Sequence, residues 1–195
     1  NVDVWFAAGK VQQPRVRNHG LVNGTWTFTG NALVTAGNSA VFSASDVSAQ
    51  PKYAVYTMPK AVPVVHEPAP KRLQVLLPNE VPAQGTSTGK TTTGITDQKV
   101  AAKFDVKVYA ADTFFNLITD DASVNRQVTL TLVDDPNAAV FAPVLPSPAQ
   151  GLVNGQATFK VDFVTKGNHT IRVQDTSGLV PQFDMRDAQL LVNPA

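Results

Sequence analysis

Residues 20–24 read GLVNG, and residues 151–155 read GLVNG again. Each copy leads into a Thr-Phe pair, at Thr27-Phe28 and at Thr158-Phe159, so the two copies match at an offset of 131 (158 − 27). A repeat at a fixed spacing indicates that a chain contains copies of one structural module. This chain therefore holds pieces of two copies of the same module.

The offset between the copies falls by one further along, since Val34 matches Val164 at an offset of 130 (164 − 34). A slip of one residue would turn every later side chain to the opposite face of its strand. A β-bulge absorbs an extra residue without that slip, and glycine supplies the backbone freedom that a bulge needs. We therefore predict a β-bulge around Gly30-Asn31-Ala32 of the first copy.

Composition excludes several kinds of protein. The 195 residues suit one or two domains, and a hydrophobic content of 43% is too high for a disordered chain. The net charge of +1 gives no reason to expect nucleic acid as a partner, and no apolar stretch approaches the ~20 residues of a membrane span. The absence of Cys excludes disulfides and thiolate metal sites. The chain starts without Met or a basic segment, so we expect a mature chain or a piece of a longer one.

Alternating apolar residues predict short strands in the first module. In the opening stretch, residues 1–8, Val2, Val4 and Phe6 share one face and Trp5 lies on the other. Residues 10–19 are polar, and we expect them to be irregular. Further strands are predicted over residues 25–30, 39–45 and 53–57.

A cluster of prolines divides the chain. Proline fixes φ and removes the amide donor, so this cluster predicts a stiff, extended linker. The predicted domains are a partial module at residues 1–58, a linker at residues 59–70 and a complete module at residues 71–195. The prolines of the linker are Pro59, Pro63, Pro68 and Pro70.

The second module reads as an antiparallel β-sandwich, because short strands alternate with turns and no helical period occurs. Its clearest strand turns Phe104, Val106, Val108 and Ala110 inward. Residues 82–94 contain no large apolar side chain and are predicted to form an exposed loop. Other strands are predicted around residues 73–77, 128–132, 157–163, 171–173 and 190–192.

Residues 71–195 contain four features in order: RLQVLLPNEVPAQGTSTGKT, KFDVKVYAADTFFNLI, GLVNGQATFKVDFVTKGNHTIRVQD, and a last strand before Asn193-Pro194-Ala195. Together they resemble the bacterial immunoglobulin-like (Ig-like) repeats of secreted and cell-surface proteins. Residues 20–57 resemble the back half of the same repeat. The resemblance implies an all-β fold of tandem antiparallel Ig-like β-sandwiches, the first one incomplete. It also implies a secreted, non-catalytic protein used for adhesion, surface layers, fibres or the spacing of domains.

The first module lacks an opening strand and an equivalent of KFDVKVYAAD. Half a sandwich leaves its core face uncovered and its strand edges unpaired. The missing half lies upstream, or a neighbouring subunit supplies it by strand addition, or residues 1–70 pack on the second module. The strand at residues 1–8 is either native to the first module or an arm for a neighbour. Its candidate assembly residues are Val2, Val4, Trp5 and Phe6.

Polar side chains gather at a turn of the second module. Asp112 and Asn116 flank the turn ADTFFN, and such side chains commonly hydrogen-bond the turn itself, which is the role we favour. The alternative is calcium held by Asp112, Asn116, Asp120 and Asp121, although no EF-hand spacing supports it and no other cofactor is expected. Phe114-Phe115 lies in the same turn, so we expect at least one exposed ring that contacts the next module or subunit.

No catalytic constellation can be assembled, so an enzyme is not predicted. Residues 85–91 read GTSTGKT, but a phosphate loop has the form G-x-x-x-x-G-K, and here only Thr86-Ser87-Thr88 stands between the glycines. His19, His66 and His169 lie far apart in the sequence, and no Ser occupies a G-x-S-x-G elbow.

Two functions follow from these observations. The favoured one is a bacterial surface protein, structural or adhesive, that forms a fibre or surface layer by head-to-tail self-association or by contact with neighbouring Ig-like modules. The alternative is an accessory module, for carbohydrate binding or as a spacer, cut from a larger secreted enzyme or adhesin. A carbohydrate-binding module predicts exposed aromatic side chains on one face.

Overall fold

The chain contains two compact units, Asn1–His66 and Glu67–Ala195. The computed structural model describes residues 2–6, 15–27, 34–35, 39–40, 42–48, 56–57, 62–63, 72–92, 94–119, 124–134, 139–142 and 149–195. The regular elements of this part of the chain are all β-strands, which confirms the all-β prediction. No helix among the described residues is long and apolar enough to cross a membrane.

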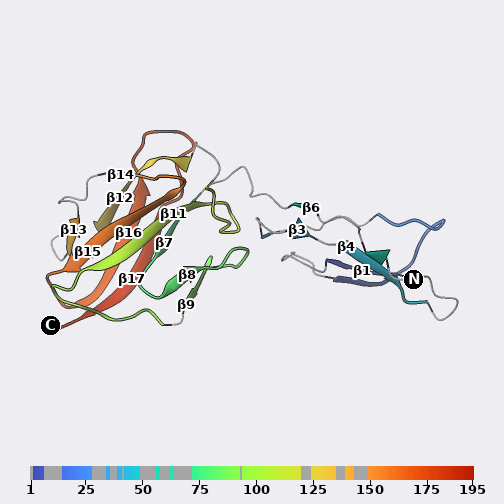
Figure 1. Ribbon diagram of the computed structural model, residues 1–195, viewed down its shortest axis with the longest axis horizontal. Coiled ribbons are helices and arrows are strands. Elements are labelled where there is room, and N and C mark those ends of the chain that lie inside the picture. The colour runs from blue at the N-terminus through green and yellow to red at the C-terminus, as the bar shows by residue number, and fades with distance from the viewer. Residues whose placement is uncertain are drawn as a thin grey trace. The chain divides into compact units, whose positions relative to one another are not determined.

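The second unit is a sandwich of two sheets (Figure 1). One sheet has the order β13-β15-β11-β7 and the other has the order β10-β17-β16-β12-β14. An immunoglobulin domain places strands ABED in one sheet and CFG in the other. Here β7, β11, β15 and β13 take the places of A, B, E and D, and β12, β16 and β17 take those of C, F and G. The strands are β7 (Arg72–Leu76), β8 (Glu80–Pro82), β9 (Lys90–Thr92), β10 (Gln98–Lys99), β11 (Phe104–Ala111), β12 (Gln127–Leu132), β13 (Ala139–Ala142), β14 (Gln150–Gly151), β15 (Gln156–Phe163), β16 (Gly167–Asp175) and β17 (Arg186–Asn193).

The core lies between these two sheets and follows from the alternation in the sequence. Strand β11 buries Phe104, Val106, Val108 and Ala110, as predicted, since successive side chains of a strand point to opposite faces. Strands β12, β15, β16 and β17 alternate in the same way. Strand β7 differs, because Leu76 on its second face is buried as well.

The predicted loop at residues 82–94 is partly wrong, because strands β8 and β9 form an antiparallel hairpin there. Its Thr, Ser and Gly residues lack apolar alternation, so the hairpin is held by polar contacts instead. The Lys90 ammonium lies 2.8 Å from the Glu80 carboxylate, and Gln74 Nε2 donates to the Gly89 carbonyl at 2.5 Å.

The first unit contains a four-stranded sheet of order β2-β1-β4-β5 and a two-stranded sheet of β3 and β6. The irregular structure predicted for residues 10–19 is wrong for residues 15–19, which form β2 despite their polar side chains. Residues 62–63, placed in the linker by the sequence, form β6 and pair with β3. The strands are β1 (Val2–Phe6), β2 (Arg15–His19), β3 (Ser39–Ala40), β4 (Phe42–Asp46), β5 (Tyr56–Thr57) and β6 (Val62–Pro63).

Strand pairing in the first unit repeats the pairing in the second. Strand β1 pairs with β4 as β12 pairs with β16, and β2 pairs with β1 as β14 pairs with β12. His19 and Gln150 are equivalent at an offset of 131 (150 − 19), the offset of the GLVNG copies. Strand β5 corresponds to the start of β17. The matching pairs are Val2↔Asp46, Val4↔Ala44 and Phe6↔Phe42 in the first unit, and Val128↔Asp175, Leu130↔Val173 and Leu132↔Ile171 in the second.

The repeat is thus longer in the structure than the sequence match at residues 20–57 indicated. The first unit reproduces the β14-β12-β16-β17 part of the second unit. Within its described residues, no strand corresponds to β7, β10 or β11. The β-bulge predicted at Gly30-Asn31-Ala32 lies outside the described residues.

Candidate functional site

The GLVNG turn of the second unit joins β14 to β15. Asn154 and Gly155 both have positive φ, 50° and 70°, as a type I′ turn requires at its two central positions. The Val153 amide donates to the Gln156 carbonyl at 2.9 Å, and the Gln156 amide donates to the Val153 carbonyl at 3.1 Å. The sequence Asn-Gly is the usual choice for this turn, because both residues tolerate positive φ.

The segment between β11 and β12 covers this turn. The Ala110 amide donates to the Gly155 carbonyl at 2.7 Å, and the Leu152 amide donates to the Arg126 carbonyl at 2.8 Å. A Cβ on Gly155 would lie 2.0 Å from the Ile118 carbonyl oxygen, so only glycine fits. Leu152 is consequently 2% exposed.

The GLVNG turn of the first unit has the same backbone, but no segment in the described part of this unit covers it. Asn23 and Gly24 have φ of 50° and 76°, and the paired Val22 and Thr25 amides donate across the turn at 2.9 and 3.0 Å. Leu21, the equivalent of Leu152, is 45% exposed. Among the described residues, nothing lies within 4 Å of a Cβ placed on Gly24. One turn of the repeat is therefore covered, and the other is open.

The strand at residues 1–8 was predicted to be either native to the first module or an arm for a neighbour, and its described residues 2–6 form β1. Val2, Val4, Trp5 and Phe6 belong to β1, which pairs with β2 on one side and with β4 on the other. Val4 is buried as well. Because both edges of β1 are already used, its backbone is native to the first unit.

Asp112 and Asn116 hold their own turn together, the role favoured from the sequence. One oxygen of Asp112 accepts from the Phe114 and Asn116 amides at 2.8 and 2.9 Å, and the other accepts from the Asn116 side chain at 2.8 Å. Asp120 and Asp121, the other two calcium candidates, lie outside the described residues. Within the described residues, no cluster of acidic, His or Cys side chains has the arrangement of a metal site.

The two aromatic residues of the pair Phe114-Phe115 differ in burial. At least one of the two rings was expected to be exposed; Phe115 is 6% exposed, which leaves Phe114 as the ring that can contact a neighbour. Phe115 fills the space beside Gly89, and two guanidinium groups lie near its ring, those of Arg72 at 4.9 Å and Arg186 at 5.4 Å. Phe114 is partly buried.

A buried ion pair that sequence reasoning missed fixes the loop between β16 and β17. Arg126 lies 3.1 Å from Asp175 and also donates to the Leu179 and Pro181 carbonyls at 3.0 and 2.9 Å. Burial acts to raise the pKa of Asp175, but hydrogen bonds from Ser177, Phe183 and Arg126 together lower it below 3.8. The carbonyl groups on both sides of Val180 are held by Arg126, while the Val180 side chain itself is 89% exposed. The turn at Asp175 could have been found from the motif Asp-x-Ser, which occurs at Asp46-Val47-Ser48 and at Asp175-Thr176-Ser177. In both, the Ser amide donates to the Asp carboxylate.

His169 has a structural role at the opposite end of the sandwich. Its ring stacks on Phe163 at 4.6 Å, with Nδ1 2.9 Å from the Asp134 carboxylate and Nε2 3.1 Å from the Thr165 carbonyl. Burial acts to raise the pKa of Asp134, but hydrogen bonds from Thr170, its own amide and His169 lower it. Both ring nitrogens are engaged, which does not favour a catalytic role.

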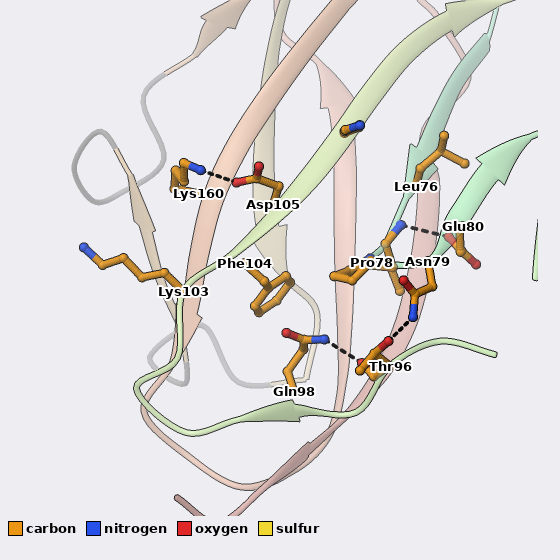
Figure 2. A pocket seen from close by; sticks show the side chains of 12 residues that line it. Leu76, Pro78, Asn79, Glu80, Thr96, Gln98, Lys103, Phe104, Asp105 and Lys160 are labelled. Carbon is orange, nitrogen blue, oxygen red and sulfur yellow. Dashed lines mark hydrogen bonds and ion pairs between the residues drawn. The ribbon is translucent and has the colours of Figure 1, made fainter. Parts of the chain in front are cut away.

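A pocket of about 560 Å³ lies beside the end of β7, the start of β11 and Lys160 of β15. Figure 2 shows Lys160 directed at Asp105, while Asn79 and Gln98 both bond Thr96. The pair of Lys160 and Asp105 is largely exposed, and the pocket lining contains no Ser, His or Cys. The aromatic residue in its lining, Phe104, is buried, so the pocket presents no exposed aromatic platform for a sugar.

Aromatic side chains do not form an exposed face in the described part of the second unit. Phe104, Phe115, Phe159, Phe163 and Phe183 are buried. Tyr109 and Phe114 are partly buried. The specific expectation of a carbohydrate-binding module is therefore not met by these side chains.

No protein-family model and no curated protein matches the chain. Among solved structures, the surface layer protein SbsC, domains 1-6, is similar over 81% of this chain and 17% of that chain, with 14% identity and a TM-score of 0.37. The D0-D1 domain of Intimin is similar over 98% of this chain and 82% of that chain, with 12% identity and a TM-score of 0.36. The β-glucuronidase of Parabacteroides merdae is similar over 98% of this chain and 20% of that chain, with 14% identity and a TM-score of 0.42. These identities and TM-scores are too low to say anything about function, and the chain spans only about a fifth of the SbsC and β-glucuronidase chains.

Proposed function

We propose that this chain is part of a non-catalytic, extracellular bacterial protein with a structural or adhesive role, built of Ig-like repeats. Its molecules form a fibre or surface layer, in which a neighbouring subunit supplies the strands that the first module lacks. Assembly is head-to-tail, and the second unit serves as the complete, load-bearing module.

The open GLVNG turn of the first unit carries this proposal. The same turn is buried in the second unit, where Leu152 is 2% exposed, whereas Leu21 is 45% exposed. Burying a fully exposed leucine gains about 1.5–3 kcal/mol, so covering Leu21, which is 45% exposed, would gain about half of that. The absence of counterparts of β7 and β11 among the described residues leaves a defined part of the module to be supplied.

The described side chains support a structural role over catalysis. His169 and the acidic residues Asp112 and Asp175 are each committed to hydrogen bonds that hold a turn or loop. Catalysis needs a nucleophile or acid–base pair facing a site where a substrate can lie. In the pocket described above, Glu80 and Asp105 are each paired with a lysine, and no Ser, His or Cys lines it.

Electron microscopy of the native material tests the proposed function. We expect filaments or a regular lattice that dissociate into single particles when Leu21→Asp is introduced. Light scattering across a wide concentration range provides the matching measurement in solution. Monodisperse single particles at every concentration would overturn the assembly role.

A further inference from the structure

We propose that a pocket in the second unit binds a sugar acid, a ligand whose carboxylate group stands on a ring that carries hydroxyl groups. The pocket has a volume of about 310 Å³, at the lower end of the range of about 300–1,000 Å³ for small-molecule sites, which suits a single sugar residue. This inference goes beyond the proposed function, because the site lies within one unit and needs no second subunit. The Arg186 pocket, as we name it, has in its lining Gln74, Ser87, Thr88, Lys90, Phe115 and Arg186.

Two residues in the lining have a buried polar atom without a hydrogen-bond partner in the described part of the chain. Gln74 is 2% exposed, and its Nε2 donates to the Gly89 carbonyl at 2.5 Å, which leaves the Oε1 acceptor unpaired. The Nε donor of Arg186 is buried and unpaired as well. Buried polar groups are nearly always paired in folded proteins. An unpaired acceptor and an unpaired donor in one lining therefore indicate a ligand that offers both a donor and an acceptor.

The charges around the Arg186 pocket favour a carboxylate as the acceptor. The guanidinium groups of Arg72 and Arg186 lie 4.9 and 5.4 Å from the centre of the Phe115 ring, and neither forms an ion pair with a described residue. Asp187 also lines the pocket, but both of its oxygens accept from Arg172 at 2.8 Å. The charge of Arg186 is therefore not compensated within the pocket. A guanidinium group binds a carboxylate through two parallel hydrogen bonds, which neutral acceptors do not match in strength.

The loop that contributes hydroxyl groups to the pocket is held in a fixed shape. Its sequence, GTSTGKT at residues 85–91, lacks the spacing of a phosphate loop, yet its glycines and hydroxyls shape this site. The Gly89 amide donates to the Thr86 hydroxyl at 3.0 Å. A Cβ on Gly89 would lie 2.2 Å from the Phe115 ring, so only glycine lets the loop lie this close to the ring. The exposed pair Ser87-Thr88 thereby lines the pocket on a preorganised loop.

Recognition in this pocket is polar rather than aromatic. Phe115 is 6% exposed, so its ring supports the loop and does not offer a face on which a sugar can stack. In the complex, Arg186 donates to the carboxylate of the ligand, and a ligand hydroxyl donates to Gln74 Oε1. The Ser87 hydroxyl is a further partner for the ring hydroxyls. A neutral sugar lacks the first of these contacts and a simple carboxylate lacks the others, so the site should distinguish a sugar acid from both.

Titration of the full, isotope-labelled chain with galacturonic acid, followed by NMR, tests the inference directly. The Gly89 amide reports on the pocket, because Gly89 follows Ser87-Thr88 in the loop and its carbonyl is bound to Gln74. We expect saturable shifts of the amides of residues 85–90 with galacturonic acid. Galactose, which lacks the carboxylate, and acetate, which lacks the hydroxyls, should each bind at least about tenfold more weakly, since a hydrogen bond to a charged group is worth about that much.

Three variants of the chain decide the position of the site. Arg186→Gln should weaken the binding of galacturonic acid at least about tenfold, because it removes the group that binds the carboxylate. Ser87→Asp should have an effect of about the same size, because it places a negative charge in the lining at an exposed position that the fold does not need. Lys103→Gln removes a positive charge from the other pocket and should bind within about twofold of the unaltered chain. Circular dichroism checks that each variant keeps its strands.

Three results would overturn the inference. Equal binding of galacturonic acid and acetate would mean that the pocket responds to charge alone. Equal weakening by Ser87→Asp and Lys103→Gln would mean that the ligand binds elsewhere or without a defined site. The absence of saturable binding to the unaltered chain would mean that water alone satisfies Gln74 and Arg186. If Arg186→Gln does not fold, the comparison of Ser87→Asp with Lys103→Gln still decides the position of the site.

Discussion

The substitution Gly155→Ala, compared with Gly24→Ala, tests the difference between the covered and the open turn. Both glycines have positive φ, 70° and 76°, so alanine costs about 1–2 kcal/mol of backbone strain at either position. At Gly155 the new methyl group would also lie 2.0 Å from the Ile118 carbonyl oxygen, a backbone atom that cannot rotate away. Overpacking of this kind adds about 1–3 kcal/mol. We therefore expect Gly155→Ala to destabilise its unit by about 2–5 kcal/mol and Gly24→Ala by about 1–2 kcal/mol.

Urea unfolding measures both effects in the full chain. Trp fluorescence reports on the first unit, because Trp5 and Trp26 are the chain's only tryptophans. Far-UV circular dichroism follows the second unit, which contributes most of the described strands. If the two substitutions lower the free energy of unfolding equally, the loop does not press on the second turn, and the contrast between the two turns is wrong.

Three further predictions concern the second unit. Arg126→Leu should lower the free energy of unfolding of the second unit by about 3–5 kcal/mol in urea titrations, because it leaves the Asp175 carboxylate buried without its cation. A cost below about 1 kcal/mol would argue against a stabilising ion pair between Arg126 and Asp175. The pKa values of Asp175 and Asp134 are lowered from 3.8, so the stabilisation from these carboxylates is complete at neutral pH and is lost as the pH falls below about 4. The midpoint of thermal unfolding should therefore fall between about pH 6 and about pH 3. An unchanged midpoint would contradict this prediction. Phe115→Ala should lower the free energy of unfolding by about 3–5 kcal/mol and speed amide exchange at Gly89, because it removes the ring that lies beside Gly89 of the β8–β9 hairpin. Slow exchange at Gly89 in the variant would contradict this prediction.

Sequence reasoning succeeded where a local pattern determines the structure. The alternation of Val106, Val108 and Ala110 predicts an inward face, and the buried side of β11 follows it. The GLVNG copies predict equivalent turns, since Asn-Gly is suited to positive φ wherever it occurs. These features depend on residues close in sequence, which is why a single sequence is enough to predict them.

The failures share a different cause, because each depends on residues far apart in the chain. Strand β2 is mostly polar, and its pairing with β1 is a long-range contact that local alternation does not reveal. Arg126 and Asp175 are 49 residues apart, so no spacing rule selects them as a pair. Phe115 has a positive φ of 60° and a buried ring, and nothing in the sequence around it requires either. Burial and pairing at these positions are decided by the assembled sandwich.

Binding of the missing strands should stabilise the first unit at the same time as it completes the module. In the second unit Val106, Val108 and Ala110 of β11 are fully buried, and a buried valine contributes about 1.5–3 kcal/mol. A module without this strand loses a large share of a total stability that is typically about 5–15 kcal/mol. A segment that binds there stabilises the folded unit by mass action, so its affinity and the unit's unfolding midpoint must rise together. Strand β11 also forms main-chain ladders with both β7 and β15. A joint between subunits made in this way depends mainly on strand register and on small residues at the turn, and it tolerates wide variation in the outward-facing side chains.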